Sequence, residues 1–198
     1  MKILHLISSP RGEASFSIKL GNAIVEKLQG ANPGSTLTTH DLTNTPFPHL
    51  EEVHINSFFT PQENHTAEFS EAIKHSNEAI AELKDADVIV IGAPLYNFGI
   101  PSTLKAWIDH IARAGQTFSY SEKGPEGLVK NKKVYLAISS GGVYSEGPMK
   151  PYDFTESYLR SVLGFMGMTD ITAYRAEGLS IPDLKDVALD KAIESIAI

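Results

Sequence analysis

The segment best suited to hold a planar ligand lies between Pro94 and Pro101. It contains two aromatic side chains, an amide and two prolines in one short turn: Pro94, Leu95, Tyr96, Asn97, Phe98, Gly99, Ile100 and Pro101. An uninterrupted apolar run, residues 88–93, precedes it, and an amphipathic run begins near Ser102. Because ligands of open α/β sheets bind at the carboxyl ends of the strands, a stiff loop at that place suits a fixed, flat ligand. A stiff loop whose aromatic side chains only pack internally is the alternative.

A serine-rich turn, residues 8–17, is a candidate anion site. Its hydroxyl groups belong to Ser8, Ser9, Ser15 and Ser17. The turn joins an apolar run to an amphipathic one, and unpaired N–H groups at the start of a helix attract negative charge. It lacks G-x-G-x-x-G and G-x-x-x-x-G-K-[ST], so one terminal phosphate monoester fits better than a pyrophosphate or triphosphate. Alternatively, Ser15 is an ordinary N-cap and the other serines are turn residues. Arg11 either touches the phosphate or is solvated.

A third loop with similar properties follows the apolar run 134–138. It contains Ser139, Ser140, Gly141, Gly142 and Tyr144. Paired glycines let a backbone approach a ligand closely, and a tyrosine can cover a flat ring. Taken alone, the loop also fits a plain glycine turn with an exposed tyrosine. Together, the three loops predict one elongated site with a phosphate end and a planar-ring end.

Hydrophobic periodicity predicts the elements that position these loops. Strands are expected at 3–7, 36–40, 88–93, 134–138 and 171–177, and helices at 15–28, 66–83, from 102 to 111, 154–166 and 184–193. In the irregular stretch 41–62, the spacing of Leu50, Val53, Phe58 and Phe59 fits a short amphipathic helix. Alternating buried strands and helices indicate a three-layer α/β/α domain with a five-stranded parallel sheet. We expect one flavodoxin-like domain over 1–198, strand order 2-1-3-4-5, with a crevice between the first and third strands.

Composition excludes several classes of function. The net charge is −7 and no basic run occurs, which argues against nucleic acid and anionic membranes. The chain has no cysteine, its seven histidines are scattered without metal-ligand spacing, and no G-x-S-x-G motif is present. No signal peptide or membrane span is recognisable. We therefore expect a soluble cytoplasmic protein without a bound metal.

The chain resembles the FMN-dependent NADH azoreductases, a branch of the flavodoxin-like NAD(P)H quinone reductases. The resemblance covers essentially the full length. The motifs that carry it are the serine turn, the 94–101 loop with the following Leu-Lys-Ala-Trp-Ile-Asp, residues 115–118, 139–142, and 163–167. The resemblance implies a homodimer with one FMN in each of two sites near the subunit interface, and NADH or NADPH as electron donor.

The resemblance also implies roles for individual residues. Ser9, Ser15 and Ser17, with the backbone of Phe16, would hold the phosphate. Pro94, Leu95, Tyr96, Asn97 and Phe98 would line the ring, with the Asn97 backbone N–H near N5, and Ser139, Gly141, Gly142 and Tyr144 would contact its other edge. Tyr120, Val162 and the partner's 41–62 segment would shape the substrate pocket. Phe16 replaces a residue that is often polar, and Val162 replaces an aromatic residue of some relatives.

The implied activity is a two-stage transfer of hydride, from NADH to the flavin and then to quinones or aromatic azo compounds. Because the flavin supplies the difficult chemistry, no catalytic side chain is expected. Two alternatives remain open at this point. One is a flavodoxin-type electron carrier without a small-molecule substrate of its own, which the acidity of the chain would suit. The other is a flavin-free module that binds a different phosphorylated ring.

Overall fold

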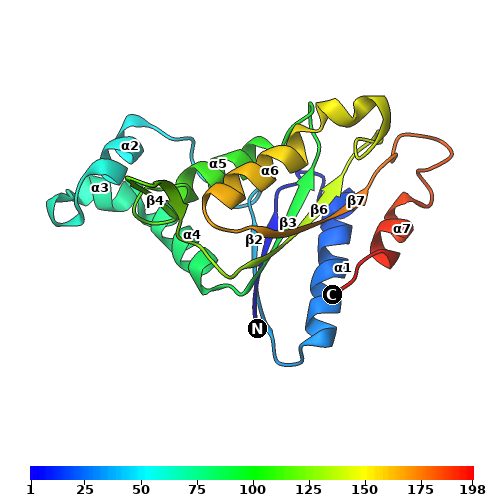
Figure 1. Cartoon of the computed structure of the whole chain (residues 1–198), viewed down its shortest axis with the longest axis horizontal. Coiled ribbons are helices and arrows are strands. Elements are labelled where there is room, and N and C mark those ends of the chain that lie inside the picture. Colours follow the sequence, from blue (N-terminus) through cyan, green and yellow to red (C-terminus); the bar gives the residue numbers. More distant parts are fainter.

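The computed structural model describes residues 1–198 and has a five-stranded parallel sheet at its centre (Figure 1). The strands are β1 (Lys2–Ile7), β2 (Thr36–Asp41), β3 (Val88–Pro94), β6 (Lys133–Ser139) and β7 (Asp170–Ala176), in the order β2-β1-β3-β6-β7. All neighbours pair in parallel. The flavodoxin-like parallel sheet is as expected. The labels differ from the predicted order 2-1-3-4-5 because β4 and β5 form a separate hairpin.

Helices cover both faces of the sheet, because successive strand residues point to opposite sides. On one face, α1 (Phe16–Ala31) and α7 (Ala188–Glu194) bury Leu20, Ile24 and Ala192 against Ile3 and Val90. On the other face, the helices are α4 (Lys74–Asp85), α5 (Ser102–Ile111) and α6 (Phe154–Phe165), which pack on the neighbouring strand residues (Figure 1). Burying each large aliphatic side chain contributes about 1.5–3 kcal/mol, so both layers are needed for stability.

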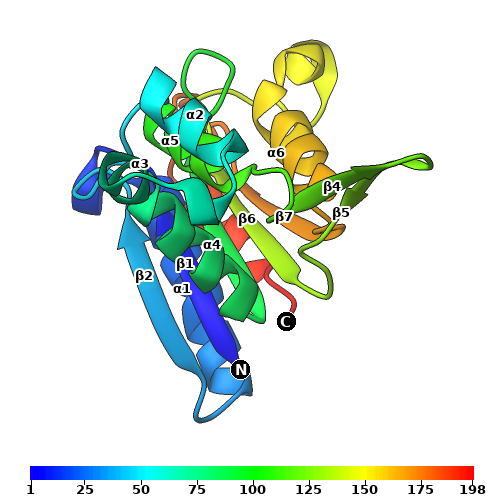
Figure 2. The same cartoon turned by 90° about the vertical axis from the view of Figure 1, so that its left-hand side faces the viewer.

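The hairpin of β4 (Phe118–Ser121) and β5 (Gly124–Gly127) was not predicted. It extends from the body of the molecule beside α6 (Figure 2). A Cβ atom on Gly127 would lie 2.2 Å from the backbone nitrogen of Gly167, so only glycine permits this contact. The Val129 N–H also donates to the Met166 carbonyl (2.9 Å), which fastens the hairpin to the end of α6.

The segment between β2 and β3 is mainly helical. It contains α2 (Glu52–Phe59), the 3-10 turn η2 (Gln62–Asn64) and α3 (Ala67–Ala72), followed by α4. A single helix over 66–83 was predicted, but the chain turns at Ile73 and divides it into α3 and α4. The closing helix starts at Ala188, four residues later than the apolar pattern suggests. The remaining 3-10 turns are η1 (Gly12–Ala14) and η3 (Gly147–Tyr152).

None of the helices is both long and apolar enough to cross a membrane.

Candidate functional site

The carboxyl ends of β1, β3, β6 and β7 surround one cavity of about 280 Å³. Its lining contains residues from all three loops identified in the sequence: Ser9, Arg11, Ser15, Phe16, Pro94, Leu95, Tyr96, Ser139, Ser140, Gly141, Leu179 and Ser180. A second cavity of about 830 Å³ shares Tyr96 with the first and includes Asn97. The serine turn and the aromatic loop therefore contribute to one continuous site at the rim of the sheet, as the topology requires.

The serine end of this site has the properties of an anion cradle. Ser15 is the N-cap of α1, and its Oγ accepts the Ile18 N–H at 3.4 Å. Ser9, Ser15 and Ser17 are buried, and the Oγ atoms of Ser15 and Ser17 are 3.1 Å apart. The N–H groups of Phe16 and Ser17 have no acceptor within the chain. Two free donors and buried hydroxyls at a helix N-terminus match a phosphate group.

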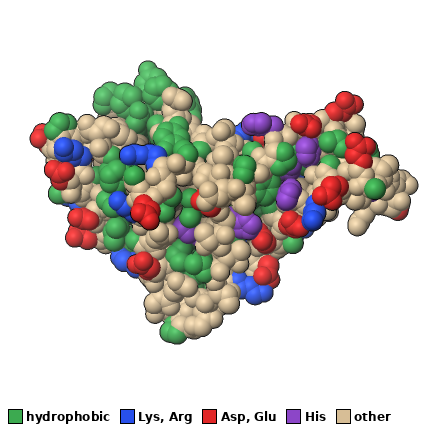
Figure 3. Space-filling view, turned by 180° about the vertical axis from the view of Figure 1, so that it is seen from behind, with side chains coloured by type: hydrophobic (Ala, Val, Ile, Leu, Met, Phe, Trp, Pro, Cys, Tyr) green, Lys and Arg blue, Asp and Glu red, His purple; other side chains and the backbone are tan.

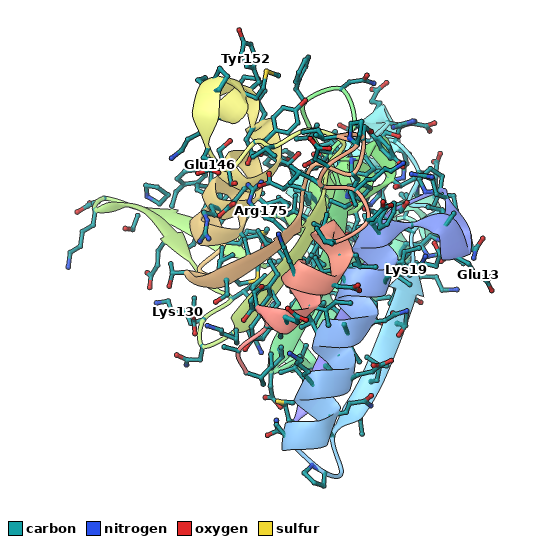
Figure 4. The ribbon with its side chains drawn as sticks, turned by 90° about the vertical axis from the view of Figure 1, so that its right-hand side faces the viewer. Glu13, Lys19, Lys130, Glu146, Tyr152 and Arg175 are labelled. Carbon is teal, nitrogen blue, oxygen red and sulfur yellow. The ribbon has the colours of Figure 1, made fainter.

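The charges around the cradle favour an anion. The side chain of Arg11 lines the cavity, whereas Glu13 points outward from the molecule, away from it (Figure 4). Lys19 lies with its Nζ 5.6 Å from the centre of the Phe16 ring, on the same helical turn. These local groups oppose the repulsion that a net charge of −7 exerts on an anionic ligand.

The aromatic loop is held in an uncommon backbone conformation. Tyr96 and Gly99 exchange two hydrogen bonds of 3.0 Å, and the two residues between them have positive φ: 49° at Asn97 and 69° at Phe98. This conformation costs a non-glycine residue about 1–2 kcal/mol. Two hydrogen bonds hold the loop in place. The Leu95 N–H donates to the Ser139 carbonyl (2.8 Å), and the Phe98 carbonyl accepts the N–H of Phe154 (3.1 Å). The N–H groups of Asn97 and Phe98 remain without an acceptor in the chain. Strain kept at such a place is typical of ligand-binding loops.

The glycine loop is positioned by residues that follow β7. The carbonyl groups of Ser140, Gly141 and Gly142 accept the N–H groups of Leu179, Ser180 and Gly178, respectively, at 2.9–3.2 Å. The segment 177–180, directly after β7, therefore forms a fourth side of the site.

A carboxylate supports the same loop. Glu177 Oε1 accepts the N–H groups of Tyr144 (2.9 Å) and Ser145 (3.1 Å) and pairs with Arg175 Nη1 at 2.9 Å. Arg175 also binds Asp153 and Glu156 at the start of α6, and its side chain lies inside the molecule (Figure 4). Burial opposes the charge of Glu156, but hydrogen bonds from Arg175 and Arg160 outweigh it and lower the pKa. The network thus joins the glycine loop, β7 and α6.

The other predicted residues lie outside the 280 Å³ cavity. Ser17 and Gly142 are immediate neighbours of its lining. Phe98 packs edge-on against Tyr144, with ring centres 6.4 Å apart, and also contacts Tyr152. Tyr120 is on the hairpin, packs edge-on against Phe118 and lies tilted against Phe165, while Val162 packs on the core from α6. Neither Tyr120 nor Val162 lines the two cavities formed by the serine turn and the aromatic loop of the same chain.

Sequence reasoning missed Glu177, Leu179 and Ser180. The signal that could have found them is their place directly after the fifth strand, because that strand ends at the same rim as the others. The structure contains no group of three or more His, Asp or Glu side chains arranged to hold a metal ion.

The chain belongs to the family of proteins with a flavodoxin-like fold, whose model matches residues 1–197. It is 44% identical over 197 residues to an FMN-dependent NADH:quinone oxidoreductase of Mesorhizobium japonicum, covering 99% of this chain and 94% of that one. It is 48% identical to FMN-dependent NADH:quinone oxidoreductase 1 of Rhizobium etli, covering 99% and 98%.

Solved structures of azoreductases are also similar to this chain. The azoreductase AzrA has a TM-score of 0.91 and 32% identity, covering 98% of this chain and 96% of that one. An FMN-dependent NADH-azoreductase of Bacillus anthracis, solved in complex with FMN, has a TM-score of 0.86 and 25% identity, covering 98% and 97%.

Proposed function

We propose that this protein is an FMN-dependent oxidoreductase that takes hydride from NADH and passes it to quinones or aromatic azo compounds. The observation that carries the proposal is the cavity that joins a helix N-terminus with free N–H donors to Leu95 and Tyr96 of the aromatic loop. The relatives at 44–48% identity are named for this activity with quinones, and the structural neighbours for azo reduction.

The residues of the site fit FMN. The N–H groups of Phe16 and Ser17, with the hydroxyls of Ser9 and Ser15, would hold its terminal phosphate. Leu95, Tyr96 and the free N–H groups of Asn97 and Phe98 would hold one edge of the ring, and residues 139–144 the other. When bound, FMN supplies the hydride-transfer chemistry, for which this cysteine-free chain has no side chain of its own. The chain supplies orientation and fixed backbone dipoles.

We infer that a second copy of the chain completes the substrate side of the site. Tyr120 and Val162 lie away from the cavity, and several large apolar side chains are exposed, including Phe59 on α2 (78% exposed) and Tyr120 on the hairpin (71%). Apolar side chains, green in Figure 3, gather at the end of the molecule that contains η3 and the start of α6. Exposed apolar area of this kind is typical of interaction sites. We therefore propose a homodimer, located in the cytoplasm, in which the partner's 41–62 segment helps to enclose the substrate.

The variant Gly141→Val tests the shared site. Its new methyl groups would enter the cavity, and its Cβ would lie 2.7 Å from the Oγ of Ser180. Flavin content after purification and FMN titration should therefore fall to background, also in the double variant with Ser180→Ala, which removes the Oγ. Gly30→Val is the matched control, because Gly30 has open space around it on α1. Normal FMN binding by both Gly141 variants would contradict the proposed site.

A further inference from the structure

A third cavity, of about 520 Å³, is lined by residues of α2, α3 and α4. These three helices lie beside one another in Figure 2. The cavity shares no lining residue with the two cavities of the flavin site. Its walls come from α2, η2, α3, α4 and the turn after α5. None of the residues assigned above to FMN lines it, although Ser57, Phe58, Thr60 and Gln62 belong to the 41–62 segment.

Arg113 is the unusual group in this cavity. The residue is only 8% exposed, and its guanidinium lies 4.5 Å above the ring of Phe58. Nη1 donates to Ser76 Oγ (3.0 Å) and to Asn77 Oδ1 (2.7 Å). Nε is enclosed without an acceptor, and Nη2 makes no hydrogen bond within the chain. Because Nη2 is not among the enclosed atoms and Arg113 lines the cavity, this nitrogen remains accessible to a ligand.

No carboxylate neutralises this buried charge. Arg113 forms no ion pair, and not one of the residues that line the cavity is Asp or Glu. A buried arginine normally has an acidic partner, since an unpaired charge in the interior costs several kcal/mol. The nearest polar neighbour, Asn77, is neutral. Burial also lowers the pKa of Arg113, as expected for a cation without a counter-charge.

The other lining residues add positive charge and an apolar wall. Lys84 is exposed at the cavity, with its Nζ 3.2 Å from Gln116 Oε1. His65 is fixed by its Nε2, which donates to the carbonyl oxygens of Ser57 (3.1 Å) and Thr60 (2.9 Å). Phe58, Ile73 and Ile80 form the apolar part. In a chain with a net charge of −7, a cavity whose only charged side chains are basic favours anions.

We propose that this cavity binds a small organic anion, with its oxyanion on the guanidinium of Arg113 and its apolar body against Phe58, Ile73 and Ile80. The accessible Nη2 can donate a charge-assisted hydrogen bond to an oxygen of a carboxylate or phosphate. The volume accommodates a ligand larger than an inorganic ion.

The test uses benzoate as probe and the FMN-loaded protein, with calorimetric titration at constant ionic strength. Benzoate should bind, and benzamide, which has the same apolar body without the charge, should not. Asn77→Asp places a carboxylate on Arg113 without changing the shape of the side chain, so benzoate affinity should fall at least about tenfold. The same variant should melt at a higher temperature without benzoate.

Asn22→Asp is the control, because it adds the same charge on the exposed side of α1. It should leave benzoate binding unchanged, and all three proteins should retain equal flavin content. Absence of benzoate binding, equal binding of benzamide, or full binding by Asn77→Asp would overturn the proposal. Flavin content and NADH oxidation report separately on the oxidoreductase site, so failure of one account leaves the other measurable.

Discussion

The hydroxyl oxygens of Ser15 and Ser17 lie 3.1 Å apart at the first turn of α1, and both residues are buried. Ser15 also caps the helix through Ile18. One residue thus has two roles, because the same Oγ that satisfies the helix N-terminus faces the anion cradle.

Ser15→Ala should therefore lower two quantities. The free energy of unfolding of the apoprotein should fall by about 1 kcal/mol, since an N-cap is lost. FMN affinity should fall about tenfold or more, because a hydrogen bond to a charged group is removed. Urea denaturation and fluorescence titration measure the two effects. Thr66→Ala is the matched control: it removes the N-cap of α3, where Thr66 accepts the Phe69 N–H at 3.1 Å, far from the site in sequence and fold. If both variants weaken FMN equally, Ser15 has no direct role in binding.

The positive φ of Asn97 allows its backbone and side-chain contributions to be separated. Asn97→Gly keeps the backbone conformation accessible and removes the side chain, so FMN affinity should stay within about twofold of the parent. Asn97→Val introduces a β-branched residue that disfavours φ of 49°, so the loop should relax and affinity should fall about tenfold. Fluorescence titration of FMN provides both values. A large loss in Asn97→Gly would mean that the amide side chain, not the backbone N–H, makes the contact.

Glu177 supports the glycine loop through the N–H groups of Tyr144 and Ser145. In Glu177→Ala these two amides should exchange with solvent faster, and FMN should bind more weakly because the loop is less ordered. Amide hydrogen exchange followed by mass spectrometry or NMR detects the change. Glu146→Ala, next to the loop but exposed and without a hydrogen bond of its own, is the control (Figure 4). Unchanged exchange at 144 and 145 in Glu177→Ala would refute the supporting role.

His5 makes the stability of the fold dependent on pH. It is buried on β1 against Gly21, where a Cβ would lie 2.7 Å from its Nε2, and burial lowers its pKa from 6.5 to about 4. Between these pH values His5 binds a proton in the unfolded chain but stays neutral in the folded chain. The free energy of unfolding should therefore decrease as the pH falls from 6.5 towards 4. The loss is about 3 kcal/mol when complete.

His5→Leu should remove that part of the pH dependence. Urea denaturation of each variant at about pH 7, 6, 5 and 4.5 gives the slope of the unfolding free energy against pH. His75→Gln provides the control, because His75 is exposed on α4. An unchanged slope in His5→Leu would show that other groups account for the acid sensitivity.

The meeting of the three loops was predictable because it depends on one rule of topology. Apolar runs at 88–93 and 134–138 are long enough to identify buried parallel strands, and parallel strands place their carboxyl ends at one rim. The break at Ile73 was not predictable, because the apolar stripe from Phe69 to Leu83 continues through it. The hairpin was missed because its turn, Glu122-Lys123, lacks the Asn-Gly or Asp-Gly signal that identifies a hairpin.

Two features of the site depend on contacts that no local pattern contains. The positive φ at Phe98 has no sequence signature, since phenylalanine rarely adopts it, and it is maintained by Phe154 from α6. Likewise, Arg175 pairs with Asp153 and Glu156, which lie 22 and 19 residues earlier in the chain, as well as with Glu177. Such networks become visible only when the fold brings distant segments together.

The most direct test of the proposed function is the visible spectrum of the purified protein during anaerobic addition of NADH and then of a quinone. The account predicts a bound flavin spectrum that bleaches with NADH and recovers when a quinone or an azo dye is added, without any partner protein. A bound flavin that NADH cannot reduce would instead indicate an electron carrier. A protein that stays colourless after FMN is supplied would contradict the flavin site itself.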